Sequence, residues 1–303
     1  MNSALRRPNT ITTSQGRFAF QAPPESASAE SALSYGIENP IPPLPPPHLA
    51  DQYFDMVYNH VQAQYSFLDW HALQLWHRDR DNICLNRPII GSGQGTDHAR
   101  GLAAFMLWLV YGYGARLMEE RKVEGAVSHE ASDLGQVMTL ANFQVYYSAA
   151  VACLSTLTSH HSLATVQCLL LLETYSIWHA RSEISTWQVA GLALRTAIEL
   201  GLHRRTRSRS EREKDPLRYE MKKRVFWTVY TMDRMIALQL GRPSGIADKD
   251  IDIEFPLNID LQVTDPKHIF EMQNRQIEIT KDRYPGAEYT KGYDQVNSVS
   301  LRL

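Results

Sequence analysis

Cysteine is scarce in this sequence, since its 303 residues contain only three, Cys84, Cys153 and Cys168. The three are widely spaced, and no two of them form a C-x-x-C pair. A disulfide framework needs paired cysteines and a cysteine zinc site needs short spacings, so the sequence encodes neither. Unpaired thiols predict a reducing compartment inside the cell.

Export signals and long apolar runs are lacking as well. The N-terminus does not show the basic-then-apolar pattern of a signal peptide, and no N-x-[ST] glycosylation acceptor occurs. The longest uncharged apolar stretch, 101–115, is shorter than the roughly 20 residues that span a bilayer. Hydrophobic residues make up 44% of the chain, which is enough for a sizeable core. We therefore expect a soluble intracellular protein without a membrane partner.

Catalytic and metal-binding motifs are also missing. The glycine-rich segment 91–95 lacks the lysine of a phosphate-binding P-loop and the glycine spacing of a dinucleotide-binding turn. His160 and His161 are adjacent, and adjacent side chains on a helix point different ways, so they do not chelate one metal. The sequence predicts no catalytic, cofactor-binding or metal-ligating residue, and we expect that the protein is not an enzyme.

Acidic residues alternate along one short stretch, at Asp248, Asp250, Asp252 and Glu254. The alternation resembles a calcium-binding loop, but the glycine and the terminal bidentate glutamate of such a loop are missing. The sequence favours the alternative, an acidic edge that pairs with Arg or Lys.

Positive charge is concentrated although the net charge is only −2. Residues 203–224 contain ten Lys or Arg against four Asp or Glu. The basic run at the start of this stretch contains Arg204, Arg205, Arg207 and Arg209. Such a run predicts either a nuclear-import signal or a solvated loop between helices. No aromatic residue interleaves with it, and we do not expect it to bind DNA directly.

Three regions of the chain differ in composition. Residues 1–48 are rich in Ser, Ala and Pro, which predicts a disordered leader or linker. The central region, residues 50–260, shows the apolar periodicity of packed helices. Residues 261–303 are polar without a clear helical pattern, and we expect a loosely packed tail.

The central region predicts an all-α, antiparallel multi-helix domain, because no run alternates with period two and the links are short. Asp51 and Ser162 are expected N-caps, and Gly201 and Gly241 are expected left-handed residues just after two helix ends. The expected helices are one from residue 51 and then 98–120, 142–158, 162–178, 185–200 and 216–240, with loops at 86–97 and 124–134. The apolar spacing of the last helix predicts an inward face of Val225, Phe226, Val229, Met232, Ile236 and Leu240.

Several motifs follow one another in a fixed order. They are L-R-T-A-I-E-L-G-L-H-R at 194–204, R-V-F-W-T-V-Y-T-M-D-R at 224–234, and L-G-R-P at 240–243 before the acidic stretch and F-P at 255–256. Upstream lie Y-F at 53–54, Y-S-F-L at 65–68, Y-Y-S-A-A at 146–150 and S-L-A-T-V-Q-C-L-L-L-L at 162–172. Together they resemble the fungal-specific transcription factor domain, the middle homology region of fungal zinc-cluster (Zn(II)2Cys6-type) transcription factors, over roughly residues 50–260.

The residues that carry this resemblance are expected to have structural and regulatory roles. They are Arg195, Leu200, Gly201, Leu202, His203, Arg224, Phe226, Trp227, Asp233, Arg234, Gly241, Arg242 and Pro243. Phe226 and Trp227 are expected to bury a large area. We expect Arg224, Asp233 and Arg234 to form an ion-pair network with the acidic edge.

The resemblance implies a nuclear regulator of transcription that controls metabolic or secondary-metabolite genes. The family reads DNA with a zinc cluster held by six cysteines, so zinc and DNA contact are expected to belong to an N-terminal module that this chain lacks. A second copy, a related factor or a small-molecule effector is an implied partner. The helices that follow the acidic stretch in the family are expected to be absent or replaced by the polar tail 261–303, as a truncated remainder of the domain. The alternative function is a helical protein-interaction module without a DNA role, acting as a partner or inhibitor of full-length relatives.

Overall fold

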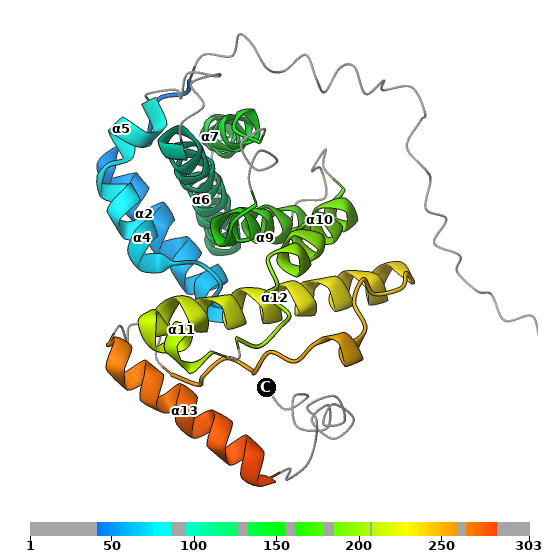
Figure 1. The fold of residues 1–303 in the computed structure, drawn as a ribbon. Coiled ribbons are helices and arrows are strands. Elements are labelled where there is room, and N and C mark those ends of the chain that lie inside the picture. The colour runs from blue at the N-terminus through cyan, green and yellow to red at the C-terminus, as the bar shows by residue number, and fades with distance from the viewer. Residues whose placement is uncertain are drawn as a thin grey trace, which may run out of the picture. The chain divides into compact units, whose positions relative to one another are not determined.

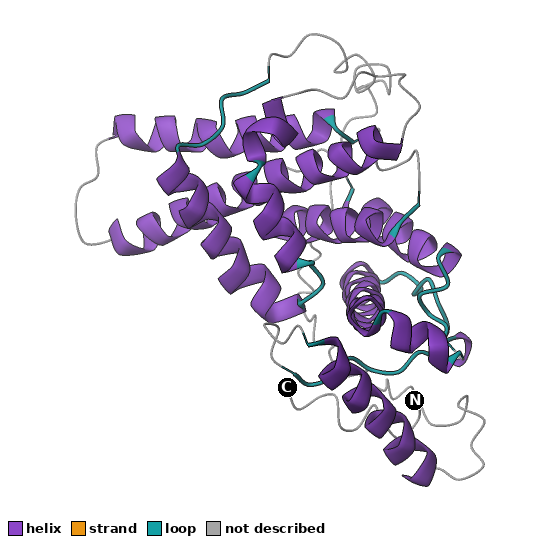
Figure 2. Cartoon of the chain, turned by 60° about the vertical axis from the view of Figure 1, so that its left-hand side comes forward, coloured by secondary structure: helices purple, strands orange, loops and turns teal. Residues whose placement is uncertain are grey.

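The computed structural model describes residues 41–85, 95–126, 133–154, 161–178, 185–206, 208–259 and 265–283. Within these ranges the chain consists of helices and connecting segments without a β-strand (Figures 1 and 2), which confirms the all-α prediction. The described residues all belong to one compact unit, which begins at Pro40. Residues 1–40 of the predicted disordered leader lie outside the described residues.

The first helix, α2 (Pro47–Val57), begins four residues before the expected N-cap Asp51. Pro47 occupies the first helical turn, where its missing N–H costs no hydrogen bond and its fixed φ suits a helix. The end of the proline run therefore starts the helix. The chain continues through the π-helical turn η2 (Tyr58–Gln62) and the short α3 (Ala63–Tyr65).

Two short helices that the sequence did not predict come next, α4 (Trp70–Arg78) and α5 (Arg80–Leu85). The carboxylate of Asp69 caps α4 by accepting a 3.0 Å hydrogen bond from the backbone N–H of Ala72. His77 links three helices, because its Nδ1 lies 2.9 Å from the Tyr111 hydroxyl and its Nε2 lies 2.8 Å from the Asp51 carboxylate. Asp51 thus supports the packing of α4 rather than capping α2.

The two longest helices of the first half, α6 (Gly95–Ala126) and α7 (Asp133–Ala152), pack against each other. Helix α6 exceeds its expected bounds at both ends, whereas α7 begins nine residues before its expected start and ends at Ala152, before the expected residue 158. Parts of the loops expected at 86–97 and 124–134 are therefore helical. Gly114 lets α2 approach α6, because a Cβ at this position would lie 2.3 Å from the carbonyl oxygen of Tyr53. The helical stretch His98–Arg121 has the length and hydropathy of a membrane span, but 83% of its apolar window is buried inside the protein, as in a core helix.

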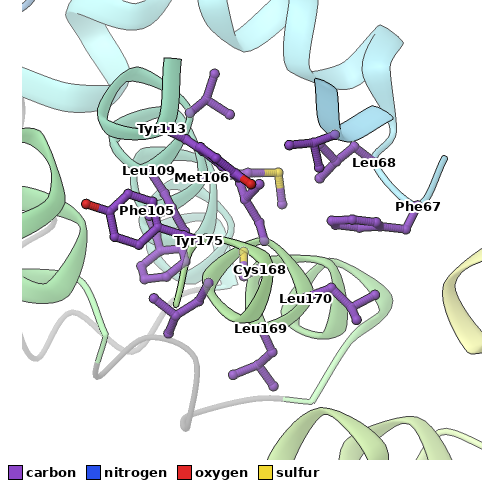
Figure 3. Packing of buried hydrophobic residues seen from close by; sticks show 14 of the residues in the cluster. Phe67, Leu68, Phe105, Met106, Leu109, Tyr113, Cys168, Leu169, Leu170 and Tyr175 are labelled. Carbon is purple, nitrogen blue, oxygen red and sulfur yellow. The ribbon is translucent and has the colours of Figure 1, made fainter. Parts of the chain in front are cut away.

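Helix α9 (Leu163–Trp178) agrees with its predicted bounds and is buried on almost every side. Ser162 caps it as expected, since its Oγ accepts a 3.1 Å hydrogen bond from the backbone N–H of Thr165. A helix that is apolar all round belongs in a core rather than at a surface. Figure 3 shows its side chains close to those of α6 and to Phe67 and Leu68, within one cluster of buried residues.

The second half of the fold centres on α12 (Pro216–Leu240), which packs against α10 (Thr186–Glu199), α9 and α13 (Pro266–Arg283). In Figure 1, α9 and α10 lie on one side of α12 and α13 lies on the other. Before α12 comes the short α11 (Arg209–Lys214), and after it the 3-10 turn η3 (Asp248–Asp250). The inward face of α12 is confirmed except for Leu240, which is 45% exposed.

Helix α13 contradicts the prediction that the chain loses helical structure after the acidic stretch. It is a polar helix whose buried positions, Ile269, Gln273 and Ile277, recur at helical spacing, and only the two isoleucines among these three are hydrophobic. Gln273 is also buried and donates a 2.9 Å hydrogen bond to the carbonyl of Pro216 at the start of α12. The hydrogen bond from Gln273 to α12 thus holds α13 in place where the sequence prediction required another apolar residue.

Candidate functional site

The family motifs from residue 194 onward, which contain all thirteen signature residues, lie on one continuous part of the chain, residues 194–257, which we call the signature segment. It contains the end of α10, the connection 200–206, α11, α12 and the chain that follows to residue 257. After the 3-10 turn η3 the chain runs beside α12 without helical structure, and we call residues 251–257 the extended segment (Figure 1).

The L-G-L motif ends α10 in a Schellman turn. Gly201 has φ +68°, a left-handed conformation that costs glycine little. The backbone N–H of Leu202 donates to the carbonyl of Ala197 and that of Gly201 to Ile198, both at 2.9 Å. The side chain of Leu202 is buried, as this turn favours. Gly241, with φ +62°, ends α12 in the same way, so both glycine predictions are confirmed.

The connection after α10 binds the extended segment through its backbone. The carbonyl oxygen of His203 accepts hydrogen bonds from the N–H groups of Asp252 and Ile253, at 3.1 and 3.2 Å. The N–H of Arg205 donates a 2.7 Å bond to the Asp252 carboxylate. Burial and, after it, the neighbouring Arg204 lower the pKa of His203, which favours its neutral form.

Ion pairs join the basic run to the acidic edge. Arg204 Nη2 lies 3.0 Å from Asp252, and Arg205 Nε lies 2.7 Å from Glu254. The second pair is well shielded, because the Arg205 side chain is 18% exposed and that of Glu254 is 4% exposed. The prediction that the acidic residues pair with Arg is confirmed, and the charges of these two arginines are compensated within the protein.

The rest of the basic run is only partly described. Arg207 lies outside the described residues. Arg209 is exposed, and its guanidinium carbon lies 5.7 Å from the centre of the Phe270 ring. Arg212, in the next turn, is buried and donates a 3.1 Å hydrogen bond to the carbonyl of Thr206. Among the described arginines of the run, Arg204 and Arg209 keep exposed side chains.

Large aromatic residues anchor α12 against the extended segment. Phe226 is fully buried, which stabilises the fold by roughly 1.5–3 kcal/mol. Trp227 is partly buried, stacks on Phe255 with ring centres 4.2 Å apart, and donates a 2.9 Å hydrogen bond from its indole to the carbonyl of Glu254. Tyr219 donates a 2.5 Å hydrogen bond to the Glu254 carboxylate. Glu254 is therefore held by three side chains: Arg205, Tyr219 and Trp227.

Arg224 does not join the expected network with the acidic edge. It pairs instead within α12, where its Nε lies 3.7 Å from Glu220. Glu220 also lies 2.7 Å from Lys223, and it accepts a 2.6 Å hydrogen bond from the N–H of Leu257. Burial lowers the pKa of both Lys223 and Arg224, and Glu220 opposes that shift. The spacing of Glu220, three and four residues before its partners, was the sequence signal for this pairing.

The C-terminal end of α12 holds the turn that follows it. Arg234 pairs with Asp248 at 2.5 Å, donates to the carbonyl of Ile246 at 2.9 Å and contacts Ser244, so this part of the predicted network is confirmed. Asp233 does not join the expected ion-pair network and instead binds the turn after α12. Its carboxylate accepts a 2.9 Å hydrogen bond from the backbone N–H of Gly245.

The remaining motif residues lie at the surface. Arg195 is exposed on α10, and Arg242 and Pro243 are exposed after α12. The guanidinium carbon of Arg242 lies 4.7 Å from the centre of the Trp187 ring, an arrangement that ties the end of α12 to the start of α10. Leu200 is half-buried at the end of α10.

The signature segment thus uses its charged residues mainly for internal pairing. Within the described ranges no three His, Cys, Asp or Glu side chains gather in a way that could hold a metal ion. The cysteines Cys84 and Cys168 are buried, and burial raises the pKa of both thiols, that of Cys84 to about 12. Such thiols are poor nucleophiles.

A comparison with protein families gives one match, to the fungal specific transcription factor domain, over residues 50–290. Among curated relatives, the negative regulator of pleiotropic drug resistance STB5 of Candida glabrata is 36% identical over 118 residues, 39% of this chain and 11% of the relative. Protein STB5 of Saccharomyces cerevisiae is 28% identical over 196 residues, 65% of this chain and 24% of the relative. The transcriptional regulatory protein C3C7.04 of Schizosaccharomyces pombe is 27% identical over 215 residues, 70% of this chain and 24% of the relative.

The chain spans about a quarter or less of the length of these relatives. No solved structure matches it. The family match begins at the fourth residue of α2 and continues beyond α12 through α13, so it covers the whole signature segment. Because the match extends over most of its residues, the chain belongs to the fungal specific transcription factor domain family.

Proposed function

We propose that this chain is the regulatory scaffold of a fungal transcription regulator that works in the nucleus and has no catalytic role. The family match over residues 50–290 carries the proposal, and the relatives that are named as regulators support it. The motif residues suit a scaffold, since Phe226 and Gly201 shape the packing while Arg234 and Glu254 hold connecting segments in place.

We further propose that this chain does not read DNA itself. A protein that binds DNA gains most of its affinity by placing Lys and Arg against phosphates. Here Arg204 and Arg205 already lie against carboxylates of the same domain. DNA contact, and the zinc that supports it, would come from a cysteine-rich module that these 303 residues do not encode, and a second copy, a related factor or a small effector would act through the scaffold.

A tethering assay tests the regulatory role. Residues 1–303 are fused to an unrelated DNA-binding module whose site lies upstream of a reporter gene. We expect the fusion to change transcription relative to the module alone. Phe226→Ala, which would leave a cavity in the core, should abolish the change. No difference between the fusion and the module alone would overturn the proposal.

The same assay distinguishes the alternative function. A fusion that is inert on the reporter, while the untethered chain lowers the output of a co-expressed full-length relative, would identify an inhibitor that acts by protein contact. Under the proposed function the tethered chain is active by itself.

A further inference from the structure

One carboxyl group in the core of the domain, that of Glu173, is buried without a hydrogen-bond partner among the residues that the structure describes. Glu173 lies on α9 and is 1% exposed. Neither of its carboxyl oxygens has a hydrogen-bond partner among the described residues. Other buried polar side chains of the same helix do have partners. Gln167 donates to the carbonyl of Phe67 at 2.8 Å, and Thr174 and Ser176 donate to carbonyls of α9 itself at 2.9 and 2.8 Å.

Within the part of the chain that the structure describes, the titratable groups that face Glu173 carry no positive charge. Asp233 of α12 and Tyr65 at the end of α3 both interact with it electrostatically. From α6, Tyr113 interacts with Tyr65. Arg116 of α6 is engaged elsewhere, in pairs with Glu119 and Glu120 at 3.3 and 3.1 Å.

The described residues of the other helices that pack on α9 do not supply a cation either. On α12, Arg234 pairs with Asp248 and Arg224 pairs with Glu220. On α10 the charged residues Arg195 and Glu199 are exposed, and Glu199 lies 2.6 Å from His161. A buried ionised carboxylate is costly unless it is paired and hydrogen-bonded. The surroundings of Glu173 therefore favour the neutral acid.

We propose that Glu173 and Asp233 form a proton-dependent switch between α9 and α12, in which a proton on Glu173 keeps the two helices packed and its loss sets two carboxylates against each other. Burial, and after it the charge of Asp233, raise the pKa of Glu173 to about 8. Glu173 therefore loses its proton at a pH close to neutral, whereas an exposed carboxyl group loses its proton at a more acidic pH.

The structure shows where the repulsion would act. Asp233 holds the turn after α12 by accepting the 2.9 Å hydrogen bond from Gly245. Gly245 in turn packs on α10, since a Cβ at this position would lie 2.5 Å from Leu194 Cδ2. When Glu173 ionises, we expect the Asp233 carboxylate to shift away from it and this turn to loosen from α10.

The sign of the pH effect follows from linkage. The folded domain binds the Glu173 proton more tightly than the unfolded chain, where the group has its ordinary value of 4.5. The contribution of Glu173 to stability is therefore complete below about pH 4.5, falls as the pH rises, and is lost above about pH 8.

Urea unfolding of the full chain at about pH 6 and about pH 9 tests the switch. We expect the unfolding midpoint of the wild type to fall between the two conditions, and that of Glu173→Gln to fall much less, so that the variant is the more stable protein at about pH 9. Glu211→Gln, at an exposed position, is the matched control and should keep the wild-type fall. An equal fall in the wild type and in Glu173→Gln would overturn the proposal.

A measurement on the wild type keeps the proposal testable if Glu173→Gln does not fold. Infrared spectroscopy should show the carbonyl band of a protonated carboxyl group at about pH 6 that disappears with a midpoint near pH 8. Absence of this band would overturn the proposal. Hydrogen exchange, corrected for its intrinsic pH dependence, should show that the Gly245 amide loses protection over the same range, and constant protection there would contradict the coupling to the turn.

Discussion

The guanidinium of Arg205 lies 2.7 Å from the carboxylate of Glu254, and this pair joins the basic run after α10 to the acidic edge after α12. The two residues are 49 positions apart in the chain and are brought together by the backbone bonds of the extended segment to His203. The acidic edge thus pairs with arginine as the sequence predicted, and part of the basic run belongs to the domain's own packing.

Glu254→Gln should destabilise the domain by about 3 kcal/mol, because it leaves the shielded Arg205 charge without its counter-charge. The free energy of urea unfolding measures the effect. Arg204→Gln is the matched control. Its pair with Asp252 is more exposed, with Arg204 at 49%, so we expect a change of at most about 1 kcal/mol. Equal losses in the two variants would contradict the special role of the Arg205–Glu254 pair.

Asp233→Ala should lower stability by about 1 kcal/mol through the loss of the hydrogen bond to Gly245. Thermal unfolding at about pH 6, where Glu173 is neutral, isolates this effect from the repulsion between the two acids. Asp233→Asn retains an acceptor oxygen and should keep most of the stability. Unchanged thermal unfolding of Asp233→Ala would show that the turn does not depend on this bond.

Two glycines should respond differently to the same substitution. Gly201→Ala should cost about 1 kcal/mol, since φ is +68° but nothing lies within 4 Å of the added Cβ. Gly114→Ala should cost about 3 kcal/mol, because its Cβ would meet the Tyr53 backbone at 2.3 Å and force α2 away from α6. Denaturant unfolding of both variants checks the order, and a smaller loss for Gly114→Ala would contradict the close helix contact.

Nuclear import through the basic run is a separate prediction. A fluorescently tagged chain in which Arg204, Arg207 and Arg209 are replaced by Gln should lose nuclear accumulation. Arg205 is left intact because its replacement would disturb the fold. A triple replacement of exposed lysines or arginines elsewhere, such as Arg78, Arg218 and Lys267, is the control. An unchanged nuclear signal would rule out the run as the import signal.

The sequence predicted most closely the helices that have a clear signal at one end at least. α9 has Ser162 before it, and α10 and α12 have Gly201 and Gly241 after them, so local chemistry defines their limits. The start of α7 was placed nine residues too late, although Leu134, Val137, Met138 and Ala141 already recur at helical spacing before residue 142. Helix α13 was missed because one of its buried residues is a glutamine, which interrupts the apolar pattern and is held by a hydrogen bond to α12.

The sequence predicted which charged residues take part in the site but not which residue pairs with which. The alternating acidic residues 248–254 predicted ion pairs, and Arg204 and Arg205 of the basic run form two of these pairs. Sequence could not choose between these and Arg224, because the choice depends on how the chain turns after α10. Glu173 gave no signal at all, since a single Glu in an apolar helix is visible as unpaired only when the neighbouring helices are in place.

The central claim is that this chain is a regulatory scaffold that does not itself read DNA. Selection from a pool of random-sequence DNA duplexes, with the purified chain as bait and several rounds of amplification, tests it most directly. The scaffold account predicts that no sequence motif is enriched over the starting pool. Recovery of a defined motif bound tightly by the chain alone would contradict it.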